Sequence, residues 1–223
     1  METNKTKIVS LIKSQQDSED RLKILNYSRK KFHSEGFYKT SMDEIAGELH
    51  VSKKTIYKYF PSKDKLLQEI CSNTSCEIMN RIEAIIDGKE DAVVKFVKLL
   101  NMHSNFTMNI SDKWLRDLSI HAPDIKKNID EMKNEQVNKV FTKLLEQGKR
   151  DKLIENFPTP IIIASFNSSL KTVLNHDFLI NNKFSIHNAF KTTYEMLLNG
   201  ILTDAGKSKF KKAKALLAKE FKL

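Results

Sequence analysis

The sequence has few of the residues that build turns or membrane spans. Only six glycines and four prolines occur in 223 residues. They lie mostly between long segments whose apolar residues have helical spacing, so we expect helices rather than a turn-rich β-structure. No run of about 18 apolar residues predicts a transmembrane helix, and no leader with a cleavage site precedes the first segment. We therefore predict a cytoplasmic, all-α protein without a membrane span.

The chain also lacks the groupings of a metal centre or a catalytic site. Cys71 and Cys76 are five residues apart on one expected helix and point in different directions, which favours two thiols over a bridge. No nucleophile elbow, glycine-rich phosphate loop or paired-carboxylate motif occurs. We therefore expect no enzymatic activity and no cofactor. We also expect no metal site, because the histidines lack the spacing of zinc ligands; they are His103, His121, His176 and His187.

Positive charge is abundant and is confined to two regions. The formal net charge is +10. Residues 21–65 contain eleven Lys or Arg against five Asp or Glu, and residues 206–223 contain seven Lys against one Glu. Each region thus carries +6 and the rest of the chain −2. A basic head on a nearly neutral body is typical of a protein that binds a polyanion such as DNA.

The first basic region predicts three helices. Asp17 and Ser18 are good N-cap residues for a first helix, which Gly36 ends. Ser41, with Glu44 three residues later, has the form of a capping box that begins a second, short helix. A turn of about four residues then leads to a third helix over residues 53–60. Two short helices joined in this way predict a helix-turn-helix.

The third helix has the features needed to enter a DNA major groove. Ile56 and Phe60 face the core at i and i+4 and hold the helix from behind, while its polar residues stay outside. Side chains at its start can reach base edges, and the capped start of the second helix can contact phosphates. The other interpretation is a three-helix bundle with solvated lysines. The predicted DNA-binding residues are Thr40, Ser41, Lys53, Lys54, Thr55, Tyr57, Lys58, Tyr59 and Lys63.

A specific order of residues runs from Ile24 to Leu67: Gly36-Phe37, Thr40-Ser41, Glu44-Ile45-Ala46, Val51-Ser52, Thr55-Ile56-Tyr57, Tyr59-Phe60 and Ser62-Lys63-Asp64-Lys65-Leu66-Leu67. In this order the segment resembles the DNA-binding domain of the TetR-type (tetracycline-repressor-like, TetR/AcrR) regulators. The resemblance implies that Thr55, Tyr57 and Lys58 occupy DNA-contact positions and that Lys63 contacts phosphate.

Two positions depart from the family pattern. The family usually has alanine where Ser28 stands and glycine in the turn where His50 stands. Histidine tolerates a positive φ less well than glycine, so we expect a slightly strained or differently angled turn. Gly47, inside the second helix, should cost about 1 kcal/mol relative to alanine.

The resemblance further implies a divergent C-terminal helical domain that dimerises and encloses a small-molecule site. We assign residues 1–66 to the DNA-binding domain and 67–223 to the regulatory and dimerisation domain. The last two long apolar segments, 160–178 and 184–203, are the expected dimer face; the other interpretation is packing within one subunit. The predicted interface residues are Ile162, Phe166, Leu170, Val173, Phe190, Thr193 and Leu197.

Aromatic, methionine and histidine side chains in the C-terminal part predict a soft apolar pocket with a few polar groups, or else belong to an ordinary core. The pocket residues are Phe96, Met102, His103, Phe106, Trp114, Leu118, His121 and Phe166. The basic tail, residues 207–223, has an apolar stripe of Phe210, Ala213, Leu217 and Phe221. It predicts a docked helix, a second contact to DNA or a membrane surface, or a frayed end.

Our sequence-based hypothesis is a homodimer that binds a pseudo-palindromic operator in double-stranded DNA. An unknown small-molecule effector in the C-terminal domain would release this repressor. The alternatives are an effector-independent DNA-binding dimer or partner-bridging protein, a peripheral membrane protein that uses the tail and, least favoured, a DNA-processing enzyme.

Overall fold

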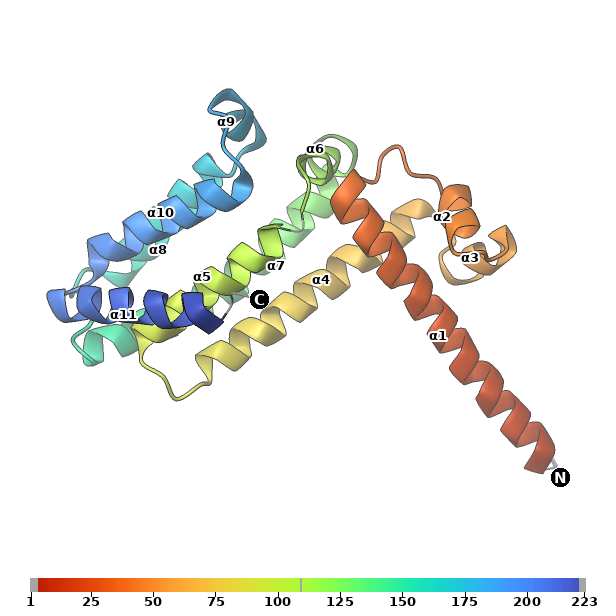
Figure 1. Ribbon diagram of the computed structural model, residues 1–223, viewed down its shortest axis with the longest axis horizontal. Helices are drawn as coiled ribbons and strands as arrows, with labels where there is room; N and C mark the ends of the chain where they lie inside the picture. The colour runs from red at the N-terminus through yellow and green to blue at the C-terminus, as the bar shows by residue number, and fades with distance from the viewer. Residues whose placement is uncertain (1–3, 109, 221–223) are drawn as a thin grey trace. The chain divides into compact units, whose positions relative to one another are not determined.

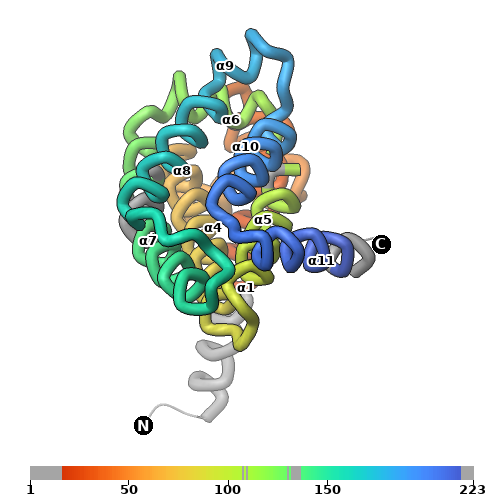
Figure 2. The backbone as a smooth tube through the Cα atoms, turned by 90° about the vertical axis from the view of Figure 1, so that its left-hand side faces the viewer, coloured from red at the N-terminus to blue at the C-terminus, as the bar shows by residue number. Residues whose placement is uncertain are grey.

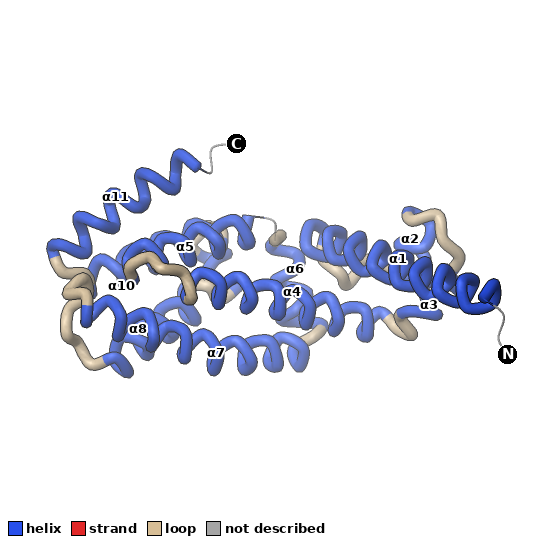
Figure 3. The backbone as a smooth tube through the Cα atoms, turned by 90° about the horizontal axis from the view of Figure 1, so that it is seen from below, coloured by secondary structure: helices blue, strands red, loops and turns tan. Residues whose placement is uncertain are grey.

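The described residues of the computed structural model form α-helices and no strand (Figure 1, Figure 3). They comprise residues 4–108 and 110–220, with the side chains of 4–16, 107, 130, 132–136 and 217–220 outside the description. The expected all-α class is confirmed. The helices are α1 (Asn4–Glu35), α2 (Met42–Glu48), α3 (Lys53–Tyr59), α4 (Lys63–Ile86), α5 (Ala92–Met108), α6 (Asp112–His121), α7 (Pro123–Arg150), α8 (Thr159–Val173), α9 (His176–Asn181), α10 (Ile186–Ile201) and α11 (Asp204–Glu220).

The chain divides into two compact units. The first comprises Met1–Thr74 and Ser111–Lys126, and the second comprises Ser75–Ile110 and Lys127–Leu223. The first unit therefore contains α1 to α3, the beginning of α4 and the whole of α6. It continues beyond the sequence-based module of residues 1–66 as far as Thr74, inside α4, and it takes in a helix from the middle of the sequence.

Helix α1 begins earlier than expected. The predicted start at Asp17 and Ser18 is wrong, because the helix already runs from Asn4. Residues 4–16 contain no glycine or proline, so nothing stops the helix there, and a good N-cap residue does not force a start. The predicted end is confirmed: Gly36 has φ 82° and its N–H donates to the Phe32 carbonyl over 2.9 Å.

The core of the first unit is formed by side chains of α1, α2, α3 and α4. Apolar side chains at helical spacing point inward from each helix and are almost fully buried. They are Ile24, Leu25, Phe32, Ile45, Ala46, Ile56, Phe60, Leu66, Leu67 and Ile70. Cys71 is buried and Cys76 is exposed, and neither forms a disulfide. This small core fixes α2 and α3 from behind.

The second unit packs α5, α7, α8, α10 and α11 around one apolar cluster (Figure 2). Aromatic rings fill its middle: Phe96 lies 5.3 Å from Phe141, and Phe141 lies 4.9 Å from Phe166 between ring centroids. The segment expected as one helix over 160–178 is two helices, because Asn175 caps the short α9 with its side chain.

The docked-helix interpretation of the basic tail is confirmed for its described part. Helix α11 packs against α5, and Phe210 and Ala213 are buried in the apolar cluster. Lys209 pairs with Asp91 over 2.8 Å. The side chain of Leu217 and the whole of Phe221 lie outside the described residues. Within the described ranges, no helix has both the length and the apolar character needed to cross a membrane.

Candidate nucleic-acid interface

The predicted capping box begins α2. The Ser41 hydroxyl accepts a hydrogen bond from the Glu44 N–H over 3.0 Å, and the Glu44 carboxylate accepts one from the Ser41 N–H over 3.5 Å. Ile45 and Ala46 are buried, whereas Ser41 is exposed. The cap thus sets the direction of α2 and leaves the Ser41 side of its start open to a ligand.

The turn between α2 and α3 is a Schellman motif with histidine at its left-handed position. The His50 N–H donates to the Gly47 carbonyl over 3.1 Å, and the Val51 N–H donates to the Ala46 carbonyl over 3.0 Å. His50 has φ 55°, which glycine adopts at lower cost. The strain expected at this departure from the family pattern is therefore present, and the two hydrogen bonds hold the turn closed.

Helix α3 presents its polar face outward, as predicted. Ser52 caps it by accepting a hydrogen bond from the Thr55 N–H over 3.0 Å. Ile56 and Phe60 are 0% and 1% exposed and anchor the helix. Of its polar residues, Lys53, Lys54, Tyr57 and Lys58 are exposed, and Thr55 and Tyr59 are half-buried.

Two of the three lysines on α3 already have carboxylate partners. Lys53 pairs with Asp43 of α2 over 2.5 Å, and Lys58 pairs with Asp17 of α1 over 2.7 Å. These hydrogen bonds raise the pKa of both lysines. The Lys54 side chain has neither a hydrogen bond nor an ion pair to any described residue.

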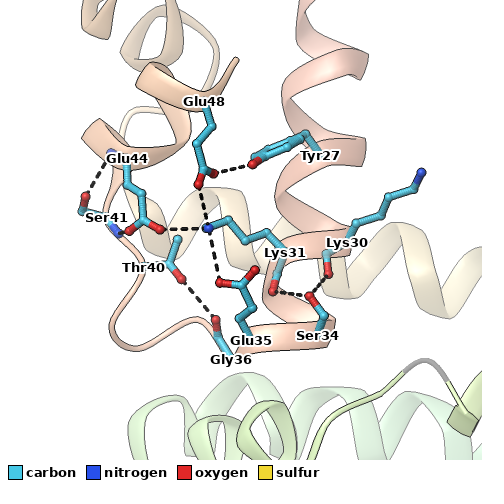
Figure 4. A network of polar contacts seen from close by, with 10 residues as sticks. All are labelled: Tyr27, Lys30, Lys31, Ser34, Glu35, Gly36, Thr40, Ser41, Glu44 and Glu48. Atoms are coloured by element: carbon cyan, nitrogen blue, oxygen red, sulfur yellow. Dashed lines mark hydrogen bonds and ion pairs between the residues drawn. The ribbon is translucent and has the colours of Figure 1, made fainter. Parts of the chain in front are cut away.

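A buried lysine that sequence reasoning missed fixes α2 against α1 (Figure 4). Lys31 is 8% exposed, and its ammonium contacts Glu44, Glu48 and Glu35 over 2.9, 3.0 and 3.3 Å. The hydrogen bond to Glu44 is the largest cause of a raised Lys31 pKa, against the effect of burial. Tyr27 donates to Glu48 from the same face of α1. Only the Glu35 contact, at i+4, was visible in the sequence.

The loop before α2 is fastened from two sides. The Tyr38 N–H donates to Asp117 of α6 over 2.8 Å, and the Tyr38 carbonyl accepts a hydrogen bond from Lys63 of α4 over 2.7 Å. The Thr40 hydroxyl is buried and donates to the Gly36 carbonyl over 3.2 Å. The structure thus gives Thr40 and Lys63, two predicted phosphate contacts, internal partners, and burial lowers the Lys63 pKa.

The predicted pocket residues divide between the two units. Trp114, Leu118 and His121 belong to α6 in the first unit, where the Trp114 ring lies 4.7 Å from His33 and 5.6 Å from Phe37 between centroids. The other five lie in the second unit: Phe96, Met102, His103, Phe106 and Phe166. Phe96 and Phe166 are core residues there, and His103 stacks on Phe190 at 3.4 Å. The eight residues therefore do not share one unit.

Much of the predicted dimer face is interior in the structure. Ile162, Phe166, Phe190 and Thr193 are 3–7% exposed within their own unit, so a partner has almost no surface of theirs to cover. Leu170, Val173 and Leu197 are half-buried. The outward positions on the same two helices include Ile161 of α8 and Met196 of α10, which are 61% and 63% exposed. These four interior residues therefore pack within one subunit, because the apolar stripes of α8 and α10 face the core of the second unit.

His33 should make the first unit sensitive to acid. Burial, with a contribution from Arg29, lowers its pKa from 6.5 to about 4. The unfolded chain therefore binds the proton first, so the stability contributed by neutral His33 is complete above pH 6.5 and is lost as the pH falls towards 4. We expect unfolding of this unit to cost about 2 kcal/mol less at pH 4.5 than at pH 7.

Chemical unfolding at the two pH values measures this loss. His33→Gln is the control, because it removes the titrating ring of His33 and keeps all carboxylates and all other histidines of the chain. An equal loss of stability in the variant would assign the acid sensitivity to other groups.

The comparisons with known proteins agree with this geometry. Residues 24–70 match the family of bacterial regulatory proteins called the tetR family. The chain is 24% identical to YvaF of Bacillus subtilis (strain 168), an HTH-type transcriptional regulator, over 74% of this chain and 86% of that protein. Among solved structures, it shares its fold with the SmeT–triclosan complex (TM-score 0.61, 14% identity, 84% of this chain and 94% of that one). The fatty acid degradation regulator FadR from Bacillus halodurans is also similar (TM-score 0.59, 19% identity, 81% and 95%). The capped helix-turn-helix lies within residues 24–70, the segment that matches the tetR family of bacterial regulatory proteins, and the fold of the chain is similar to that of the two regulator structures.

Proposed function

We propose that this regulator is a homodimeric repressor that binds a pseudo-palindromic operator through α3 and leaves it when a small apolar effector binds the second unit. The observation that carries the DNA-binding part is the two-sided character of α3. Ile56 and Phe60 hold it rigidly from behind, and Lys54 and Tyr57 project from it into solvent. A rigid helix with free polar side chains at its start can read base edges in the major groove.

The test is operator binding by a triple variant. The operator is first selected from a pool of random duplexes with the wild-type protein. Replacing Lys54, Thr55 and Tyr57 together by alanine should then weaken binding at least about 100-fold, because each lost base or phosphate contact costs about 1–3 kcal/mol. Fluorescence anisotropy with a labelled operator measures the change.

The matched comparison is Lys211→Ala with Lys212→Ala, on the exposed side of α11. This variant removes more charge than the triple variant but leaves α3 intact, so its operator affinity should stay close to that of the wild type. A wild-type protein that selects no sequence over random duplex would contradict the proposal. So would a triple variant with undiminished affinity.

For the dimer, we propose the outward face of α8 and α10 rather than the apolar stripe. These helices pack against each other in the second unit, and Ile161 and Met196 expose large apolar side chains on them. Two helices from each copy would then form a four-helix arrangement. Sedimentation velocity at micromolar concentration should show a dimer, and a monomer there would refute this assignment.

The proposed effector is small and largely apolar. The rings of Phe96, Phe166 and Tyr194 line the middle of the second unit, and the buried Tyr194 hydroxyl is a polar group among them, donating to the Phe96 carbonyl over 3.3 Å. The SmeT structure is a complex with triclosan, and FadR regulates fatty acid degradation. These likenesses support an apolar ligand for this chain as well.

A second candidate is a DNA-binding dimer that responds to no effector. Packed rings fill the core of the second unit, and a hollow of about 450 Å³ found in this unit is an open groove lined by Asp87, Lys143, Glu146 and Arg150 among others. Thermal unfolding with a panel of apolar aromatic compounds separates the two candidates. A compound that raises the melting temperature and releases the operator supports the effector, and a panel without such a compound favours the second candidate.

A further inference from the structure

Two of the three lysines on α3, Lys53 and Lys58, are held by carboxylates from other helices. Asp17 of α1 accepts hydrogen bonds from the Lys58 ammonium over 2.7 Å and from the Tyr59 hydroxyl over 2.9 Å. The Lys58 ammonium also lies 4.8 Å from the centre of the Tyr59 ring. Asp43 of α2 holds Lys53 in the same way. Carboxylates therefore occupy the positions at which phosphate oxygens would contact these lysines.

We propose that Asp17 and Asp43 are specificity-determining residues that compete with DNA phosphates for Lys58 and Lys53. This inference rests on the proposed function and deepens it. By occupying these lysines, the two carboxylates lower the affinity of the protein for DNA of arbitrary sequence. Only a duplex whose backbone fits α3 closely displaces them, so the ratio of operator affinity to random-sequence affinity rises.

The exposure of the two pairs makes this exchange feasible. The side chains of Lys58 and Asp17 are 51% and 40% exposed, and those of Lys53 and Asp43 are 68% and 52% exposed. Ion pairs this accessible to water are weak, so a well-placed phosphate can replace the carboxylate. A poorly placed phosphate gains less from the lysine and is also repelled by the aspartate.

The other role for Asp17 would be to hold Lys58 and Tyr59 in the orientation that DNA requires. The two roles predict opposite signs. If Asp17 positions the pair, its removal weakens binding to every duplex. If Asp17 competes with phosphate, its removal strengthens binding to duplexes of any sequence and adds a phosphate contact. Each added phosphate contact steepens the dependence of log affinity on log salt by about 0.9.

The experiment measures binding of the full-length protein to a short duplex of random sequence by fluorescence anisotropy over a series of KCl concentrations. We expect Asp17→Asn to bind about fivefold more tightly at about 0.1 M KCl, with the slope steeper by about 0.9. In a Lys58→Met background the same substitution should change neither quantity, because Lys58 is the group for which Asp17 and phosphate compete.

The matched control is Asp151→Asn, an exposed aspartate of the second unit that gives the same change in net charge. An equal gain in this control, a gain that persists without Lys58, or an unchanged or weaker affinity in folded Asp17→Asn would overturn the inference. Circular dichroism verifies the fold. If Asp17→Asn does not fold, Asp43→Asn with and without Lys53→Met gives the same test. Failure of the wild-type protein to bind any duplex would instead refute the proposed function.

Discussion

Replacing Gly206 by alanine is expected to destabilise the second unit by about 3 kcal/mol or more. A Cβ atom at this position would lie 2.1 Å from the Leu153 carbonyl oxygen and 3.0 Å from a methyl group of Leu202. The nearer atom belongs to the backbone, so no side-chain rotation can relieve the clash. Helix α11 would have to move away, and Phe210 and Ala213 would lose their place in the apolar cluster.

Chemical unfolding followed by circular dichroism measures this effect. The control is Ser208→Ala, on the exposed side of the same helix, which should change the free energy of unfolding by less than about 0.5 kcal/mol. Equal stability of the Gly206→Ala protein and the wild type would mean that α11 contributes little to the second unit.

Replacing Trp114 by alanine is expected to destabilise the first unit by about 3–5 kcal/mol. Trp114 is 5% exposed, and its ring packs edge-on against His33 of α1 and Phe37 of the following loop. The truncation leaves a cavity between these rings and loosens α6. Because Asp117 of the same helix holds the Tyr38 N–H, the loop that leads to the Ser41 cap should loosen too, and DNA binding should weaken with stability.

Trp114→Phe is the control, since it keeps an aromatic ring at this place and should recover most of the stability. Unfolding is followed by chemical denaturation and DNA binding by anisotropy. If Trp114→Ala were as stable as the wild type but lost only its response to an effector, Trp114 would be a ligand contact, as the sequence suggested, rather than a packing residue.

Local chemistry made the helix-turn-helix predictable. The Ser41 capping box and the inward pair Ile56 and Phe60 each depend on residues at most four positions apart, and the structure contains both features. The left-handed turn at His50 was expected from the family resemblance, because the family usually has glycine at this position. Such signals remain readable in a single sequence because the interacting groups are neighbours along the chain.

Features set by distant contacts were not predictable. The network at Lys31 joins α1 to α2 through Glu44 and Glu48, and nothing in the local spacing links them. The predicted pocket residues do not share one unit because α6, which carries Trp114, packs against α1, a helix far from it in the sequence. The predicted dimer-interface residues were chosen from the apolar stripe of each helix. Apolar residues at helical spacing occur both at interfaces and in protein interiors, so the spacing does not distinguish the two.

The path of the chain between the two units determines which fragments of this protein can fold. It passes from one unit to the other at Thr74, at Ile110 and at Lys126. A fragment that stops at Thr74 keeps the helix-turn-helix but lacks the Trp114 ring that covers Phe37 and the carboxylate that holds Tyr38. A chimera that replaces the first unit should accordingly exchange Ser111–Lys126 together with the N-terminal segment, because a single junction would combine parts of two different cores.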